Sequence, residues 1–268
     1  MHIVIIGKYT GGGKATMQMV LLTALGIGGS TIIGAVIGFF VKNVSNKVND
    51  RIMGFAAGVM LAAAINGLIA PAFELVEQIG ILIPVIGIFT GAFFLNGMER
   101  LIPYLNRWLN IQKEEDKDIS NRKLSRALLF VLAVAIHNLP EGMAAGVSFG
   151  NEDITAAITV AIGIALQNVP EGIVTISPLV MAGIGARRAF LIAAVTGLIE
   201  VIGTLFGFFL ASLSKALLPF LLSFAGGTML YIISDEMIPE THRHGFEKSS
   251  TYSLLVGFTL MIMMNIVI

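Results

Sequence analysis

The feature that most constrains how this chain folds is a series of eight long stretches that carry almost no charge. They run over about 17–41, 52–76, 82–103, 124–149, 154–183, 188–213, 217–240 and 251–268. The hydrocarbon core of a bilayer is roughly 30 Å thick, so one helical crossing needs about 20 predominantly apolar residues. The pattern therefore predicts an all-α integral membrane protein with eight transmembrane helices.

The composition agrees with a chain that lies mostly in lipid. Of its 268 residues, 56% are hydrophobic and 13% are charged, whereas a soluble domain has about 45–50% apolar and about 25% charged residues. The absence of cysteine excludes disulfides and thiolate metal sites. The apolar composition makes the lipid bilayer the expected partner. The net charge is zero, so no nucleic-acid partner is expected.

The distribution of positive charge predicts the orientation. Eight crossings place both chain ends on one side of the membrane. Of the 17 Lys and Arg residues, 14 then fall on the opposite side, and those that fall with the ends are Lys8, Lys14 and Lys215. Because positive residues accumulate in cytoplasmic loops, we expect a multi-pass protein of the cell membrane (inner or plasma) with both termini extracytoplasmic.

One long polar segment of mixed charge divides the spans into a group of three and a group of five. The apolar part of the first residues is too short for a signal peptide. We therefore expect an extracytoplasmic leader at 1–16, transmembrane helices 1–3 at 17–103, a cytoplasmic loop at 104–123 and transmembrane helices 4–8 at 124–268.

Three carboxylates, Glu141, Glu171 and Glu200, remain near the middle of their spans once loop and helix-end residues are set aside. No Lys or Arg lies at that depth in the sequence. A charged side chain there costs about 2.5–3.5 kcal/mol on insertion scales. Each acid is therefore either neutral and hydrogen-bonded to a neighbouring helix, or shares a cation with the others.

Two of these acids belong to similar motifs, AIHNLPEGM at 135–143 and ALQNVPEGI at 165–173. Residues four apart share one face of a helix. The first polar residue of each motif, His137 or Gln167, therefore lies beside the glutamate of the same motif. The two motifs predict one group of cation ligands that is drawn from two neighbouring helices.

A second group follows from the residues three positions before each glutamate. Asn138 flanks Glu141 and Asn168 flanks Glu171, because residues three apart are also neighbours on a helix. Each glutamate can face both groups, so the geometry predicts two neighbouring cation sites that share two carboxylates.

Each motif also places a proline inside its span. Pro140 and Pro170 each remove a helical hydrogen bond and would free the carbonyls of Ile136 and Leu166. Interrupted helices in the middle of a membrane are where transporters bind ions. Proline kinks are also common in membrane helices that bind no ion. The prolines therefore count as support for the cation sites only because each lies next to a glutamate.

The ligand types narrow the choice of ion. Sites built from oxygen alone suit Mg²⁺ or Ca²⁺, whereas an imidazole favours divalent transition metals. With one histidine, amides and carboxylates, we expect Zn²⁺ or a related ion such as Fe²⁺, Mn²⁺, Cd²⁺ or Co²⁺. No organic cofactor is expected.

Several segments together resemble one family. HNLPEG and QNVPEG, with GLIEVIGT at 197–204, SDEMIPETHRHG at 234–245 and AAGVML at 56–61, resemble the ZIP (Zrt/Irt-like) family of divalent metal transporters. The second motif begins with glutamine, and in this it resembles the GufA-like branch of the ZIP family, which is related to bacterial zinc-uptake members. The resemblance implies a bundle of eight helices, arranged 3+2+3, in which helices 1–3 and 6–8 are inverted repeats.

The resemblance also implies two sets of metal ligands. The first ion would be held by His137, Glu141, Gln167 and Glu171. The second would be held by Asn138, Glu141, Asn168, Glu171 and Glu200. Many relatives have His at the position of Gln167, which puts strict zinc selectivity in doubt, and some have an acid at Asn168. Met60 matches a position that can approach the metal, although plain packing explains it equally well.

Polar residues outside the motifs could form the entrance and the exit of a metal pathway. The entrance would hold Glu74 and Glu77, although exposed acids at a helix end are ordinary. The exit would hold Asp235, Glu236, Glu240, His242 and His244. That exit group is equally compatible with a solvated helix end.

The function favoured by the sequence is transport of a divalent metal, most simply Zn²⁺, into the cytoplasm, with no enzymatic activity. A proton- or sodium-coupled carrier of another substrate is one alternative, and an intramembrane metalloenzyme is another. The enzyme is the weaker of the two, because the chain has no HExxH motif. A homodimer and the form of energy coupling stay open.

Overall fold

The computed structural model describes residues 12–40, 45–76, 80–108, 119–151, 153–181 and 184–267, and these residues form helices and short connecting turns without a strand. The all-α prediction is confirmed. The charged loop expected at 104–123 is shorter, because α4 (Leu82–Trp108) and α5 (Ile119–Ser148) extend into it from both sides.

The remaining helices match the predicted spans closely. The first half adds α1 (Gly12–Phe40) and the sequence of α2 (Asn46–Ala62), η1 (Ala63–Ile69) and α3 (Ala70–Glu74). After α5 come η3 (Phe149–Asn151), α6 (Ile154–Met181) and α7 (Ala186–Leu213). The chain ends with η4 (Lys215–Leu217), α8 (Leu218–Ile232), η5 (Ile233–Met237), α9 (Ile238–Thr241) and α10 (Glu247–Val267).

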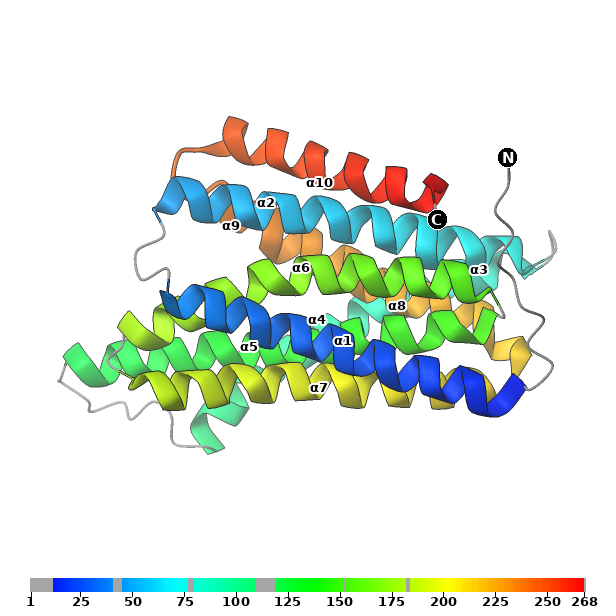
Figure 1. Cartoon of the computed structure of the whole chain (residues 1–268), viewed down its shortest axis with the longest axis horizontal. Helices are drawn as coiled ribbons and strands as arrows, with labels where there is room; N and C mark the ends of the chain where they lie inside the picture. The colour runs from blue at the N-terminus through cyan, green and yellow to red at the C-terminus, as the bar shows by residue number, and fades with distance from the viewer. Residues whose placement is uncertain are drawn as a thin grey trace.

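Within the described residues, seven helical segments are long and apolar enough to cross a membrane. Helix α5, with 30 residues, has the length of an eighth. The start of α1 and the end of α10 lie at the same end of the bundle (Figure 1), as an even number of crossings requires. The starts of α2 and α10 and all of α9 lie toward the other end.

Helix packing shows the inverted repeat that the resemblance implied. The most extensive contacts are those of α1 with α6, α5 with α7, α2 with α10 and α4 with α8. These contacts form two equivalent pairs. The contact of α1 with α6 corresponds to that of α7 with α5, and the contact of α2 with α10 corresponds to that of α8 with α4. In Figure 1, α5 and α6 lie in the middle of the bundle, with α2 and α10 on one side of them and α7 on the other. The contacts therefore follow an approximate two-fold relation.

The same relation is visible in the spacing of small residues along α1 and α7. Glycines recur at 28, 34 and 38 in α1 and at 197, 203 and 207 in α7. A Cβ atom on Gly34 would collide with the carbonyl oxygen of Val169, and one on Gly203 with that of Leu139. Such small residues allow backbones to approach closely in a membrane. In this alignment Thr31 occupies the position that corresponds to Glu200.

The irregular helical turns do not lie where the prolines of the two motifs predicted them. Helices α5 and α6 continue through Pro140 and Pro170. Instead, π-helical turns interrupt the second and seventh spans at η1 and η5, shortly before Pro71 and Pro239. π-Helical turns often accompany functional sites, and η5 contains two of the predicted exit acids.

The close helix contacts predict a sharp difference between two glycine substitutions. In Gly172→Ala, the new Cβ would collide with the carbonyl oxygen of Thr31, whereas nothing lies within 4 Å of a Cβ on Gly29. We expect Gly172→Ala to destabilise the protein by about 1–3 kcal/mol and Gly29→Ala to be neutral or stabilising. Thermal unfolding in detergent measures both, and equal melting temperatures would contradict the packing described.

Candidate metal centre

Helices α5 and α6 bring the first predicted group of ligands together. His137, Glu141, Gln167 and Glu171 line one cavity of about 350 Å³. All four side chains come from the two HNLPEG-like motifs, and their spacing of four residues puts each pair on one helix face. Glu141 lies beside Gln167 and Glu171. The sequence therefore identified the four residues that meet at the inner wall of the cavity.

Five side-chain oxygens of the two motifs are buried without a hydrogen-bond partner, and those of Glu141, Gln167 and Glu171 belong to residues that line the cavity. They are Glu141 Oε2, Gln167 Oε1, Glu171 Oε1, Asn138 Oδ1 and Asn168 Oδ1. A buried acceptor left unsatisfied costs roughly 1–3 kcal/mol, and native structures contain few of them. No Lys or Arg forms an ion pair with Glu141 or Glu171 among the described side chains. A bound cation is the kind of partner that such oxygens lack.

Glu200 lies in a different environment from the other two acids. It is fully buried and is not part of the cavity wall. Its Oε1 accepts hydrogen bonds from Asn138 Nδ2 at 2.6 Å and from Thr31 Oγ1 at 2.9 Å. Its Oε2 accepts one from Asn168 Nδ2 at 2.6 Å. Direct metal ligation by Glu200 stays a prediction.

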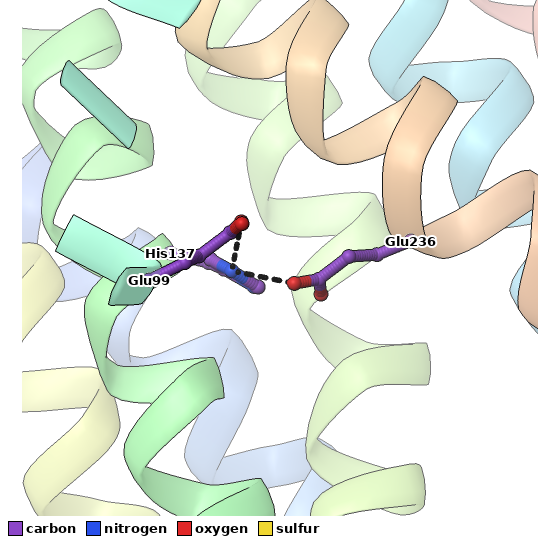
Figure 2. A group of neighbouring side chains, drawn as sticks. All are labelled: Glu99, His137 and Glu236. Carbon is purple, nitrogen blue, oxygen red and sulfur yellow. Dashed lines mark ion pairs between the residues drawn. The ribbon is translucent and has the colours of Figure 1, made fainter. Parts of the chain in front are cut away.

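A second group of ligands at the cavity was only partly foreseen. Figure 2 shows His137 between two carboxylates, with Nε2 lying 3.1 Å from Glu236 Oε1 and 3.6 Å from Glu99 Oε1. The ligand atoms of the three residues all lie within 4.8 Å of one another. They come from α5, η5 and α4. Such a group can hold either a proton on the imidazole or a metal ion between its members.

Glu99 was missed because the neighbouring Arg100 marks the end of the third span, where an acid is unremarkable. The structure shows that Glu99 is instead held within the bundle. Asn96 Nδ2 donates to the Tyr231 hydroxyl at 2.7 Å, and that hydroxyl donates to Glu99 Oε2 at 3.2 Å. The spacing of Asn96 and Glu99, three residues apart on one helix face, was the available signal.

The predicted exit residues divide into two sets. Asp235, Glu236 and Glu240 line the same cavity as the motif residues. Arg243 also lines it and forms an ion pair with Glu240 at 2.8 Å, with 70% of the Arg243 side chain exposed. The cavity therefore reaches solvent beside α9, at the end of the bundle opposite the start of α1 (Figure 1).

The two histidines after α9 do not line the cavity. His242 is exposed. His244 Nδ1 lies 2.9 Å from Oδ1 of Asp50, a fully buried residue at the start of α2. This pair ties the turn that follows α9 to α2. Asp50 was not singled out from the sequence, because it also lies at a helix end among charged residues.

Met60 and Glu74 are not among the residues that line this cavity. Met60 is fully buried in an apolar cluster with residues such as Ile164 and Met229. Glu74 is exposed at the end of α3. Glu77 lies outside the described residues. A metal contact of Met60 and an entrance at Glu74 and Glu77 stay predictions.

Comparison with known proteins gives the family. Residues 109–265 match the family described as ZIP Zinc transporter. Zinc transporter GufA of Myxococcus xanthus is 39% identical over 251 residues, which cover 91% of this chain and 97% of that protein. The chain belongs to the ZIP family. The resemblance inferred from the motifs, including its GufA-like character, is confirmed.

Two further ZIP relatives cover the chain as fully. Zinc transporter ZIPB of Bordetella bronchiseptica is 32% identical over 97% of this chain and 85% of its own length. Zinc transporter ZupT of Chlorobaculum parvum is 37% identical over 91% of this chain and 94% of its own. All of these relatives are named as transporters, which confirms a ZIP membrane transporter rather than an enzyme.

The group of Glu99, His137 and Glu236 predicts the effect of removing one acid on metal binding. We expect Glu236→Gln and Glu99→Gln each to lower the affinity for Cd²⁺, used as a probe, by about tenfold or more. Glu247→Gln should leave it unchanged, because Glu247 is an exposed acid at the same end of the bundle and outside the cavity. Isothermal titration of the purified protein gives the affinities. Identical binding by all three variants would remove Glu99 and Glu236 from the site.

Proposed function

We propose that this ZIP protein carries divalent transition-metal cations, foremost Zn²⁺, across the cell membrane into the cytoplasm. The observation that supports it most directly is the set of buried, unpartnered carboxylate and amide oxygens at the wall of a cavity that reaches solvent. A bare cation matches such a set, because oxygens without donors attract positive charge and repel anions. The names of the relatives, all zinc transporters, agree.

The first cation subsite would be formed by the side chains that line the cavity wall, His137, Glu141, Gln167 and Glu171. Its one imidazole favours Zn²⁺, Fe²⁺, Mn²⁺, Cd²⁺ or Co²⁺ over Mg²⁺ and Ca²⁺. A second subsite would share the two glutamates and add the amide oxygens of Asn138 and Asn168. Both amide oxygens are buried and lack a partner.

The cavity suggests how the ion is released. His137 belongs both to the first subsite and to the group with Glu99 and Glu236, so an ion can pass between them without leaving its imidazole ligand. Asp235 and Glu240 follow toward the mouth of the cavity. If both termini are extracytoplasmic, as the charge distribution predicts, this mouth faces the cytoplasm and the structure represents an inward-open state.

The metal is the transported substrate, and the proposal needs no organic cofactor. The bilayer is the expected environment of the apolar helix faces, which expose side chains such as Phe89, Phe93, Leu198 and Tyr252. Homodimerisation remains an expectation. A carrier of an anionic organic substrate is less consistent with the site, because Arg243 is the one Lys or Arg among the described residues that line the cavity, and it is paired with Glu240.

Reconstitution in liposomes tests the proposal. The purified protein would be incorporated into vesicles that contain a metal-sensitive dye, and Zn²⁺, Fe²⁺, Mn²⁺, Cd²⁺ or Co²⁺ would be added outside. We expect time-dependent uptake of Zn²⁺ that saturates and that the other ions inhibit. Empty vesicles provide the control. Absence of uptake for every divalent metal would overturn the proposed function.

Replacing one shared ligand should abolish transport. Glu171→Ala removes a carboxylate that faces both subsites, so we expect zinc uptake to fall to the level of empty vesicles. Asn168→Ala removes a neutral ligand of one subsite, and we expect a loss of about tenfold. The liposome assay measures both, and equal losses would argue against two subsites that share the glutamates.

Gln167 should set part of the metal preference. Replacing its amide by an imidazole in Gln167→His gives the first subsite a second nitrogen ligand, which favours Zn²⁺ over ions that prefer oxygen. We expect Mn²⁺ to compete with zinc uptake about tenfold less effectively in the variant, the ratio that a difference of about 1.4 kcal/mol gives. Gln167→Glu keeps an oxygen ligand and serves as the matched control. Unchanged competition in Gln167→His would exclude this role.

A further inference from the structure

We propose that Tyr231 and Asn96 act together as positioning residues for the carboxylate of Glu99. They hold one oxygen of that carboxylate, so that the other oxygen is aimed at His137. The inference rests on the proposed function, because it concerns how an ion is held in the group of Glu99, His137 and Glu236 on its way out. Tyr231 and Asn96 do not contact the ion and act on it through Glu99 alone.

The three residues form a chain of hydrogen bonds between two helices. Asn96 Nδ2 donates to the Tyr231 hydroxyl oxygen at 2.7 Å. The hydroxyl in turn donates to Glu99 Oε2 at 3.2 Å. Asn96 and Glu99 lie on α4, three residues apart on one helix face, and Tyr231 lies on α8. The chain therefore runs from α4 to α8 and back to α4.

The donors and acceptors give this chain a single direction. A tyrosine hydroxyl carries one hydrogen, and an amide N–H group can donate but not accept. Because the hydroxyl oxygen accepts from Asn96, its own hydrogen is available to Glu99. If the Asn96 amide were rotated by half a turn, its oxygen would face the hydroxyl and compete with Glu99 for that hydrogen. Asn96 therefore directs the hydroxyl, and the hydroxyl anchors the carboxylate.

The anchored carboxylate presents its second oxygen to the imidazole. Glu99 Oε1 is buried and has no hydrogen-bond partner within the described part of the chain, and the same is true of His137 Nε2. These two atoms lie 3.6 Å apart (Figure 2), which is too far for a hydrogen bond. Two ligand atoms that each lie about 2.0–2.2 Å from one tetrahedral zinc ion are roughly 3.3–3.6 Å apart. The spacing therefore matches two ligands of one metal ion.

The packing of α4 on α8 keeps the hydroxyl at a fixed place beside Glu99. A Cβ atom on Gly227 would collide with the carbonyl oxygen of Ile88, and one on Gly91 with that of Phe224, so the two backbones are in contact. Tyr231 lies four residues after Gly227 and therefore on the same face of α8, toward α4. A free glutamate side chain has many rotamers to lose when it binds an ion. Anchoring one oxygen removes part of that cost before the ion arrives.

The same hydrogen bonds also suit a purely structural tie between α4 and α8, and the two roles differ in what they depend on. A tie stabilises the helix pair whether or not Glu99 binds metal. A positioning role changes metal affinity, and only while the Glu99 carboxylate is present. Residues that hydrogen-bond a metal ligand typically change affinity by about 10–100-fold when they are replaced.

The first test removes the hydroxyl alone. Tyr231→Phe keeps the aromatic ring, and we expect it to lower the affinity for Cd²⁺, used as a probe, by about tenfold. Tyr252→Phe is the matched control, because Tyr252 lies on α10 with 72% of its surface exposed, and it should bind Cd²⁺ like the unmodified protein. Isothermal titration of the purified protein gives the affinities. Unchanged affinity in Tyr231→Phe would overturn the proposal.

The second test asks whether the hydroxyl acts through Glu99. Tyr231→Phe is compared in the unmodified protein and in the Glu99→Ala variant, again by titration with Cd²⁺. A positioning role predicts that Glu99→Ala itself lowers the affinity and that Tyr231→Phe then causes no further loss. The same loss from Tyr231→Phe in both backgrounds, or no loss from Glu99→Ala, would contradict the proposed role.

The order of the chain is tested with Asn96→Leu, which keeps nearly the same shape and removes the amide. We expect Asn96→Leu to lower the Cd²⁺ affinity severalfold in the unmodified protein and to have no effect when Tyr231→Phe is already present, because the amide acts through the hydroxyl. Equal losses in both backgrounds would show that Asn96 does not direct Tyr231.

Two controls keep the outcomes distinct. Gel filtration and thermal unfolding establish that each variant is folded, and if Tyr231→Phe does not fold, Asn96→Leu compared with and without Glu99→Ala decides in its place. Zinc uptake by the unmodified protein in liposomes tests the proposed function separately. Absence of uptake overturns the function, whereas uptake together with equal losses in both backgrounds overturns only the positioning role.

Discussion

Carboxylates buried in a membrane protein without basic partners are the constraint on which this structure depends. Glu141, Glu171 and Glu200 lie in the interior. None of them forms an ion pair with Lys or Arg among the described side chains, so the cost of burying each acid must be offset in another way. Glu200 is compensated by hydrogen bonds from three helices. Glu141 and Glu171 each keep an unpartnered oxygen at a cavity. Glu200 is therefore fully hydrogen-bonded within the bundle, whereas Glu141 and Glu171 each present a free oxygen at the cavity.

The bundle can bring these acids together because its helices approach unusually closely. Gly142 and Gly172 leave no room for a Cβ atom beside the carbonyl oxygens of Glu200 and Thr31. In lipid, where apolar surfaces gain little from meeting each other, such contacts between small residues drive helix association. The glycines that hold the helices together are therefore adjacent to the residues of the site, and packing and function share the same few turns.

Hydropathy and helical spacing are local properties, so the sequence alone predicted the spans and the first ligand group, whereas the inverted repeat came from the resemblance to the ZIP family. In the two motifs, the spacing of four residues between His137 and Glu141 and between Gln167 and Glu171 was enough to predict which side chains share a helix face. The sequence did not predict Glu99 or Thr31, whose roles depend on which helices meet. The positions of the π-helical turns were also missed. The prolines Pro140 and Pro170 predicted interruptions in their own helices, whereas the structure has the π-helical turns just before Pro71 and Pro239.

The glycine contacts have a mechanical consequence. Gly34 lies against Val169, and Gly203 lies against Leu139, so α1 packs on α6 and α7 packs on α5 backbone to backbone as two close pairs of helices. The pairs meet where Gly28 faces Gly197, one turn from the hydrogen bond between Thr31 and Glu200. A movement that separates the pairs must break that bond. The hydrogen bond between Thr31 and Glu200 therefore ties the two pairs of helices to one another beside their closest backbone contact.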